Sequence, residues 1–247
     1  MEMVLLTALG VGGATIFGSV VGFAFKKISH KFSDIVLAFA AGVMLAAAVL
    51  GLIVPSVEYG NLFITVAGIF CGALCLNMVD KIVPHLHRIA GTDTENHTNN
   101  ADLNKVLLFV IAIAIHNLPE GIAAGVSFGT GNTSEAMLIA GGIALQNIPE
   151  GMVIIAPMLN AGIPPRRTFL CAMATGLIEV AGTLIGYFAV TVASAILPFA
   201  LAFAGGTMLY VISDEMIPET HHDDTSGATY SLLAGFCIML ISDVLLG

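Results

Sequence analysis

Two short segments place cation-binding side chains beside a proline inside long apolar runs. IAIHNLPEG (113–121) and IALQNIPEG (143–151) lie 30 positions apart and share six of nine residues. Side chains three and four positions apart lie on one face of a helix, so the polar residues of each segment project together. Imidazole, carboxylate and amide oxygen are donors that suit Zn²⁺, Fe²⁺ and Mn²⁺. The polar residues of the two segments are His116, Asn117 and Glu120, and Gln146, Asn147 and Glu150.

The acids of these segments have no lysine or arginine near them in the sequence. Glu120, Glu150 and Glu179, the last from another apolar run, place up to three negative charges at mid-depth. An ionisable group at the centre of a bilayer costs about 2.5–3.5 kcal/mol on insertion scales. The acids are therefore protonated, or a cation neutralises them. One divalent ion would reduce the charge of −3 to −1 and two would make it +1, so a one- or two-metal site fits the donors better than protonated acids.

The composition indicates which solvent surrounds these segments. Hydrophobic residues make up 57% of the 247 positions and charged residues 10%, against about 25% charged in soluble domains, and the mean hydropathy is +0.96. So few charged groups could not cover the surface of a soluble protein. The composition excludes a soluble enzyme, a disordered chain and a nucleic-acid binder, and it predicts an integral membrane protein whose partner is the lipid bilayer.

The apolar runs predict an all-α protein with eight transmembrane helices in a single domain, 1–247. A spanning helix needs about 20 apolar residues, and the runs lack the alternation of barrel strands. Pro119 and Pro149 each remove a backbone donor, which predicts broken helices in spans 4 and 5. The expected spans are 4–25, 34–57, 62–80, 106–129, 136–158, 168–190, 195–217 and 229–246.

The basic residues predict the orientation. All eight lie in the loops after spans 1, 3 and 5, and the loops after spans 2, 4 and 6 carry none. Cytoplasmic loops carry the excess of Lys and Arg, so we expect both termini on the outer side of the cytoplasmic (inner) membrane. The loop 81–105 is then cytoplasmic, as is the loop after span 7. We hypothesise that their histidines form a low-affinity set that receives or senses metal: His85, His87, His97, His221 and His222.

HNLPEG (116–121) and QNIPEG (146–151) resemble the paired signature of the ZIP (Zrt/Irt-like) divalent metal transporters, and the Gln-Asn pair resembles their GufA-like bacterial branch. The resemblance covers the whole chain. It implies an inverted repeat of spans 1–3 and 6–8 around spans 4 and 5, with elevator-like motion. It implies import of Zn²⁺ as the substrate, with Cd²⁺, Fe²⁺, Mn²⁺ and Co²⁺ as further candidates and no organic cofactor.

The resemblance also implies roles for individual residues. One metal site would use His116, Glu120, Gln146 and Glu150, with Met44 as a thioether ligand. An adjacent site would use Asn117, Asn147 and Glu179 and share the two motif glutamates. Glu58 would be an entrance acid, and Asp214, Glu215 and Glu219 would lie along the inner exit. Many family members have histidine in place of Gln146, and some have aspartate in place of Asn147.

Two other functions stay open at this point. An intramembrane metal-dependent hydrolase would need three fixed strong ligands and a general base, and the weak amide ligands disfavour it. A proton-coupled carrier of another solute would use the acids as proton relays. We expect a transporter rather than an enzyme, and the sequence leaves a homodimer open.

Overall fold

The computed structural model describes residues 1–24, 30–82, 114–115, 117–160, 162–220 and 225–246. Within them, seven helices are long and apolar enough to cross a membrane. A further helical stretch over 117–127 belongs to the expected fourth span. The protein is thus an all-α integral membrane protein, and the count of eight spans stays a prediction, because much of the fourth lies outside the described residues.

The observed helices begin and end within a few residues of the expected spans. Spans 2 and 7 are composite, since each joins an α-helix, a π-helical segment and a second short α-helix. The elements in chain order are α1 (Glu2–Ala24), α2 (His30–Ala46), η1 (Ala47–Ile53), α3 (Val54–Tyr59), α4 (Leu62–Ile82), η3 (Phe128–Thr130), α6 (Thr133–Asn160), α7 (Pro165–Val192), η4 (Ser194–Ile196), α8 (Leu197–Val211), η5 (Ile212–Met216), α9 (Ile217–Glu219) and α10 (Thr225–Leu246).

The helices pair as an inverted repeat requires. In one group α1 packs on α6 and α7, and the helix over 117–127 packs on α7 through glycines of both helices. In the other group α2 packs on α10, and α4 on α8. Exchanging spans 1–3 with spans 6–8, and span 4 with span 5, converts α1 on α6 into the 117–127 helix on α7 and α2 on α10 into α8 on α4, and it leaves the pair of α1 and α7 unchanged. The inverted repeat expected from the resemblance is therefore confirmed.

A sequence repeat that the sequence analysis missed accompanies this symmetry. LAFAAGVML (37–45) in α2 and LAFAGGTML (201–209) in α8 lie 164 positions apart and agree at seven of nine residues. Their glycines make equivalent contacts. A Cβ atom on Gly42 would collide with the backbone carbonyl of Leu232, and one on Gly206 with that of Ile69. Only glycine allows the two helix backbones to come so close.

The expected break in span 5 is wrong. α6 runs as one α-helix through Pro149, and residues 117–127 are helical through Pro119. One missing hydrogen bond does not end a helix in lipid, where any further unpaired backbone group would cost several kcal/mol.

Irregular helix geometry lies instead in spans 2 and 7, directly before Pro55 and Pro218. There the N–H of Val54 bonds to the Val49 carbonyl, and that of Ile217 to the Ile212 carbonyl, five residues back.

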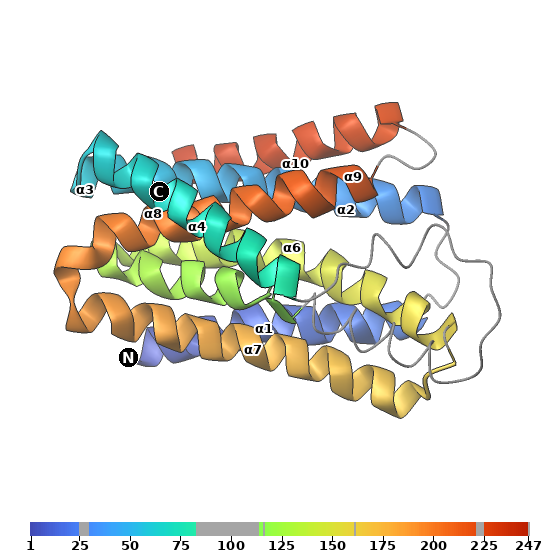
Figure 1. Ribbon diagram of the computed structural model, residues 1–247. Coiled ribbons are helices and arrows are strands. Elements are labelled where there is room, and N and C mark those ends of the chain that lie inside the picture. Colours follow the sequence, from blue (N-terminus) through green and yellow to red (C-terminus); the bar gives the residue numbers. More distant parts are fainter. Residues whose placement is uncertain (25–29, 83–113, 116, 161, 221–224, 247) are drawn as a thin grey trace.

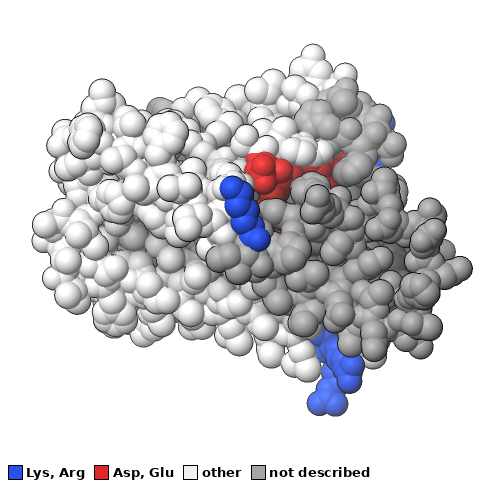
Figure 2. All heavy atoms as spheres, viewed as in Figure 1, with Lys and Arg blue, Asp and Glu red and all other residues white. Residues whose placement is uncertain are grey.

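The outer surface suits a bilayer. Large apolar side chains on α4 and α10 are strongly exposed, among them Phe63, Phe70, Tyr230 and Val244, and uncharged side chains cover most of the described surface in Figure 2. Both chain termini lie at one end of the bundle, whereas α1 and α6 end, and α2 and α7 begin, at the other (Figure 1). The two termini therefore lie on the same side of the membrane.

Candidate metal site

Glu179 of α7 lies at the centre of a buried hydrogen-bond network. Its Oε1 accepts a hydrogen bond from Thr15 Oγ1 at 2.5 Å and another from Asn117 Nδ2, and its Oε2 accepts one from Asn147 Nδ2 at 2.6 Å. The three donors come from α1, from the helix over 117–127 and from α6. All four side chains are fully buried. One carboxylate thus joins both motif helices and the first span.

Glu120 and Gln146 form a second contact between the motif helices. Gln146 Nε2 donates to Glu120 Oε1 at 2.8 Å, and both side chains are fully buried. Glu150 lies one turn further along α6 than Gln146 and keeps 8% of its surface exposed. Of the motif carboxylates, that of Glu150 is therefore the one that retains some contact with solvent.

Four buried oxygen atoms of these residues have no hydrogen-bond partner among the described residues. They are Asn117 Oδ1, Glu120 Oε2, Gln146 Oε1 and Asn147 Oδ1. The amide nitrogens of Asn117 and Asn147 donate to Glu179, and the amide nitrogen of Gln146 donates to Glu120. A buried polar atom left unpaired costs about 1–3 kcal/mol. A cation bound between the two motifs could be coordinated by these four unpaired oxygens.

The donors at this centre are a mixture of carboxylate and amide. Among the described residues, no three His, Cys, Asp or Glu side chains gather closely enough to hold a metal ion by themselves. His116, the imidazole expected at the first site, lies outside the described residues. A metal held here would therefore need the amide oxygens, which are weak ligands and release an ion readily.

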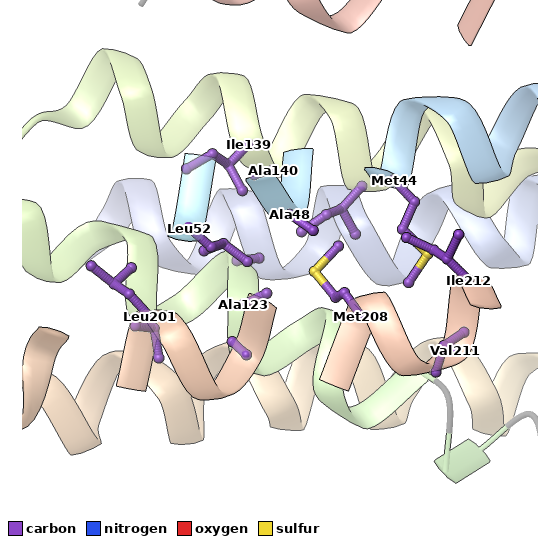
Figure 3. Close-up of a cluster of buried hydrophobic side chains, with 14 of the residues drawn as sticks. Met44, Ala48, Leu52, Ala123, Ile139, Ala140, Leu201, Met208, Val211 and Ile212 are labelled. Atoms are coloured by element: carbon purple, nitrogen blue, oxygen red, sulfur yellow. The ribbon is translucent and has the colours of Figure 1, made fainter. Parts of the chain in front are cut away.

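Figure 3 shows a cluster of buried apolar side chains, two of which follow or precede a motif ligand by one helical turn. It includes Met44 of α2, Met208 of α8, Ile143 of α6 and Ala123, all at most 1% exposed. Ala123 follows Glu120 by three residues and Ile143 precedes Gln146 by three, so each shares a helix face with a candidate ligand. The cluster excludes water from the space beside the site.

The remaining expected acids take no part in the hydrogen bonds described above for the buried centre. Glu58 is exposed near the end of α3, at the end of the bundle where the termini lie. Asp214 in η5 and Glu219 in α9 are exposed, and Glu215 is half-buried. The structure does not bring these acids to the centre. The loop histidines lie outside the described residues: His85, His87, His97, His221 and His222.

Thr15 is the central residue that the sequence analysis did not find. It is one of several hydroxyl residues in an apolar run, and nothing local distinguishes it. The sequence feature that could have identified it is a spacing of 164 residues. This spacing relates Thr15 to Glu179, and it also relates Gly12 to Gly176 and Gly18 to Gly182. The reciprocal contacts of Gly12 and Gly176 place this pair of helices face to face.

An all-helical membrane protein built as an inverted repeat around a buried polar centre has the architecture of a secondary transporter. A family model described as "ZIP Zinc transporter" matches residues 102–243, and relatives at more than 30% identity cover nearly the whole chain. The chain belongs to the ZIP transporter family. The expected resemblance is thus confirmed, and the protein is a transporter rather than an enzyme.

Three bacterial relatives show the extent of the similarity. The chain is 41% identical to the zinc transporter GufA of Myxococcus xanthus over 73% of its own length and 70% of that protein. It is 36% identical to the zinc transporter ZIPB of Bordetella bronchiseptica over 95% and 78%. It is 33% identical to the zinc transporter ZupT of Chlorobaculum parvum over 94% and 92%. The similarity to GufA agrees with the expected GufA-like branch, and these relatives do not support a hydrolase or a carrier of another solute.

Proposed function

We propose that the protein carries Zn²⁺ and related divalent metal ions into the cytoplasm through a site at mid-membrane. The observation that carries the proposal is the set of four buried oxygens without hydrogen-bond partners, contributed by the two repeated motifs. The names of the relatives, all zinc transporters, support zinc as the substrate. Cd²⁺, Fe²⁺, Mn²⁺ and Co²⁺ are further candidates, because carboxylate and amide oxygens accept harder ions as well.

The proposed ligands form two adjacent sites. The first takes His116, Glu120, Gln146 and Glu150, with Met44 as a thioether. The second takes Asn117, Asn147 and Glu179 and shares the two motif glutamates. The hydrogen bonds from both asparagines to Glu179 support the proximity of the three side chains in this second set. Because those contacts use the amide nitrogens, the amide oxygens are left for a metal ion.

Charge supports a cation as the occupant. Between residues 106 and 217 the basic residues are Arg166 and Arg167, and both belong to the first turn of α7, three turns from Glu179. No lysine or arginine side chain of this stretch can therefore neutralise the motif acids at mid-depth. A divalent ion brings the compensating charge from outside the chain.

The direction of transport follows from the proposed orientation. With both termini outside the inner membrane, Glu58 lies at the entrance, and Asp214, Glu215 and Glu219 lie at the exit. The loop histidines would then receive metal on the cytoplasmic side, so deleting residues 92–100 should change uptake or its feedback by metal. Unchanged uptake and feedback would refute that role. A homodimer stays a prediction, which the mass of the purified protein in detergent would test.

The test of the proposed function is metal flux into sealed proteoliposomes. Wild-type protein should take up Zn²⁺, with Cd²⁺, Mn²⁺, Fe²⁺ and Co²⁺ competing to different degrees. Glu120→Ala and Glu150→Ala should abolish the uptake while the protein still elutes as a folded species. Glu2→Ala is the matched control, because Glu2 is exposed at the start of α1. Flux at the wild-type level in both motif variants would overturn the mechanism.

A further inference from the structure

The two methionines in the apolar cluster are equivalent under the inverted repeat. Met44 and Met208 occupy the same position in LAFAAGVML (37–45) and LAFAGGTML (201–209), 164 residues apart. Their helices make equivalent contacts through Gly42 and Gly206. The repeat therefore relates the two sulfur atoms in structure as well as in sequence.

Both thioethers are buried beside the candidate site. Met44 and Met208 are each 0% exposed, and both belong to the cluster that contains Ala123 and Ile143. Figure 3 shows the two side chains entering the same apolar region from α2 and from α8. Ala123 and Ile143 lie one turn from Glu120 and Gln146, so the cluster adjoins the metal donors on both motif helices.

Equivalent residues of an inverted repeat exchange surroundings when the transporter changes the side to which its site opens. A contact that the site makes with span 2 in one state is then made with span 7 in the other. Met44 and Met208 are the equivalent sulfur-bearing residues of these two spans. Thioether sulfur is a soft, neutral donor that suits soft metal ions and binds harder ones weakly.

We propose that Met208 is a second thioether ligand for the transported metal. When the site turns from one side of the membrane to the other, Met44 releases the ion and Met208 binds it. This inference rests on the proposed function and on Met44 as a ligand. It assigns α8 a part in metal selectivity beyond its packing role. A soft ion would then keep a sulfur contact in both states, whereas a hard ion would rely on oxygen donors throughout.

The test compares uptake of Cd²⁺ and Mn²⁺ by proteoliposomes. Met208→Leu keeps an apolar side chain of similar volume and removes the sulfur. It should lower Cd²⁺ uptake by about fivefold and change Mn²⁺ uptake much less, because Mn²⁺ gains little from a thioether. Met44→Leu should have the same effect. Met158→Leu is the matched control, since Met158 is a fully buried methionine of α6 outside the cluster.

A second pair of variants tests the proposal even if Met208→Leu fails to fold. Met208→Cys and Met208→Val have side chains of similar size, and the cysteine variant alone keeps a sulfur donor. The Cys variant should retain the preference for Cd²⁺ over Mn²⁺, and the Val variant should lose it. This comparison separates a ligand from a residue that only fills space.

The outcomes distinguish this inference from the proposed function. Wild-type vesicles that take up neither metal would refute the function itself. Wild-type vesicles that take up both metals, together with a Cd²⁺ to Mn²⁺ ratio unchanged by Met208→Leu, would overturn the role of Met208 alone. An equal loss for both metals in the Leu, Cys and Val variants would also overturn it, because packing and not the sulfur would then matter.

Discussion

Thr15 and Glu179, which occupy equivalent positions in the two halves of an inverted repeat, form a hydrogen bond with each other. Thr15 Oγ1 donates to Glu179 Oε1 at 2.5 Å, and the two positions are 164 residues apart. Neighbouring positions keep the symmetry, because Ser19 and Thr183 each donate to the carbonyl four residues back. At the pair of Thr15 and Glu179 the symmetry is therefore broken, with a hydroxyl on one side and a carboxylate on the other.

This asymmetry explains why the centre holds a single carboxylate, that of Glu179, in addition to the two motif glutamates. A second carboxylate in place of Thr15 would face that of Glu179 in a region of low dielectric, where like charges repel strongly. The hydroxyl instead donates to the acid. Together with Asn117 and Asn147 it supplies three donors to the Glu179 carboxylate. Glu179 thereby fixes the orientation of both amides.

We expect Thr15→Val to weaken the network. The substitution keeps the shape of the side chain and removes the hydroxyl, and a hydrogen bond to a charged group contributes about 1.5–3 kcal/mol. The free energy of unfolding in detergent should fall by an amount in that range, and Zn²⁺ uptake should fall with it. Thr191→Val is the control, because Thr191 is exposed and bonds only within α7. Equal stability of the two variants would argue against the role assigned to Thr15.

Asn147→Asp should make the protein depend on metal for its stability. The amide nitrogen that donates to Glu179 Oε2 at 2.6 Å becomes a carboxylate oxygen, which places two acids in contact. The melting temperature without metal should fall, and the increase on adding Zn²⁺ should exceed that of wild-type protein, because the ion offsets the new charge. Asn132→Asp, at an exposed position before α6, is the control. A Zn²⁺-induced increase no larger than that of wild-type protein would contradict a metal at the second site.

Gln146→His should change selectivity among metals. The imidazole replaces the amide that now donates to Glu120, and imidazole binds Zn²⁺ better than an amide oxygen does. We expect Zn²⁺ to compete more strongly against Mn²⁺ in uptake assays with this variant, by about tenfold in apparent affinity. Unchanged competition would show that residue 146 does not contact the metal.

Alanine at the symmetric glycines should destabilise the protein. A Cβ atom on Gly42 or on Gly206 would overlap a backbone carbonyl of the neighbouring helix, and such overpacking costs about 1–3 kcal/mol. Gly10→Ala is the control, because a Cβ atom there meets nothing within 4 Å, and alanine favours a helix over glycine by about 1 kcal/mol. Thermal unfolding in detergent should rank Gly10→Ala above the other two variants, and the reverse order would contradict the packing.

The spans could be predicted from the sequence because hydropathy is a local property. A run of about 20 apolar residues has to cross the bilayer as a helix whatever its neighbours are, and the observed helices begin and end close to the expected positions. The two motifs were also visible locally, since polar residues repeated 30 positions apart stand out in apolar surroundings. The expected break at Pro149 failed because a proline removes one hydrogen bond and the rest of α6 keeps its own.

The residues alone identify a membrane protein, its helices, and three acids with no lysine or arginine near them in the sequence. Which of these residues meet depends on how the helices pack. Thr15 reaches Glu179 across 164 positions, both asparagines direct their nitrogens to the same carboxylate, and four oxygens are left without partners among the described residues. These contacts depend on the packing of glycine-lined helices against each other, which no single segment encodes.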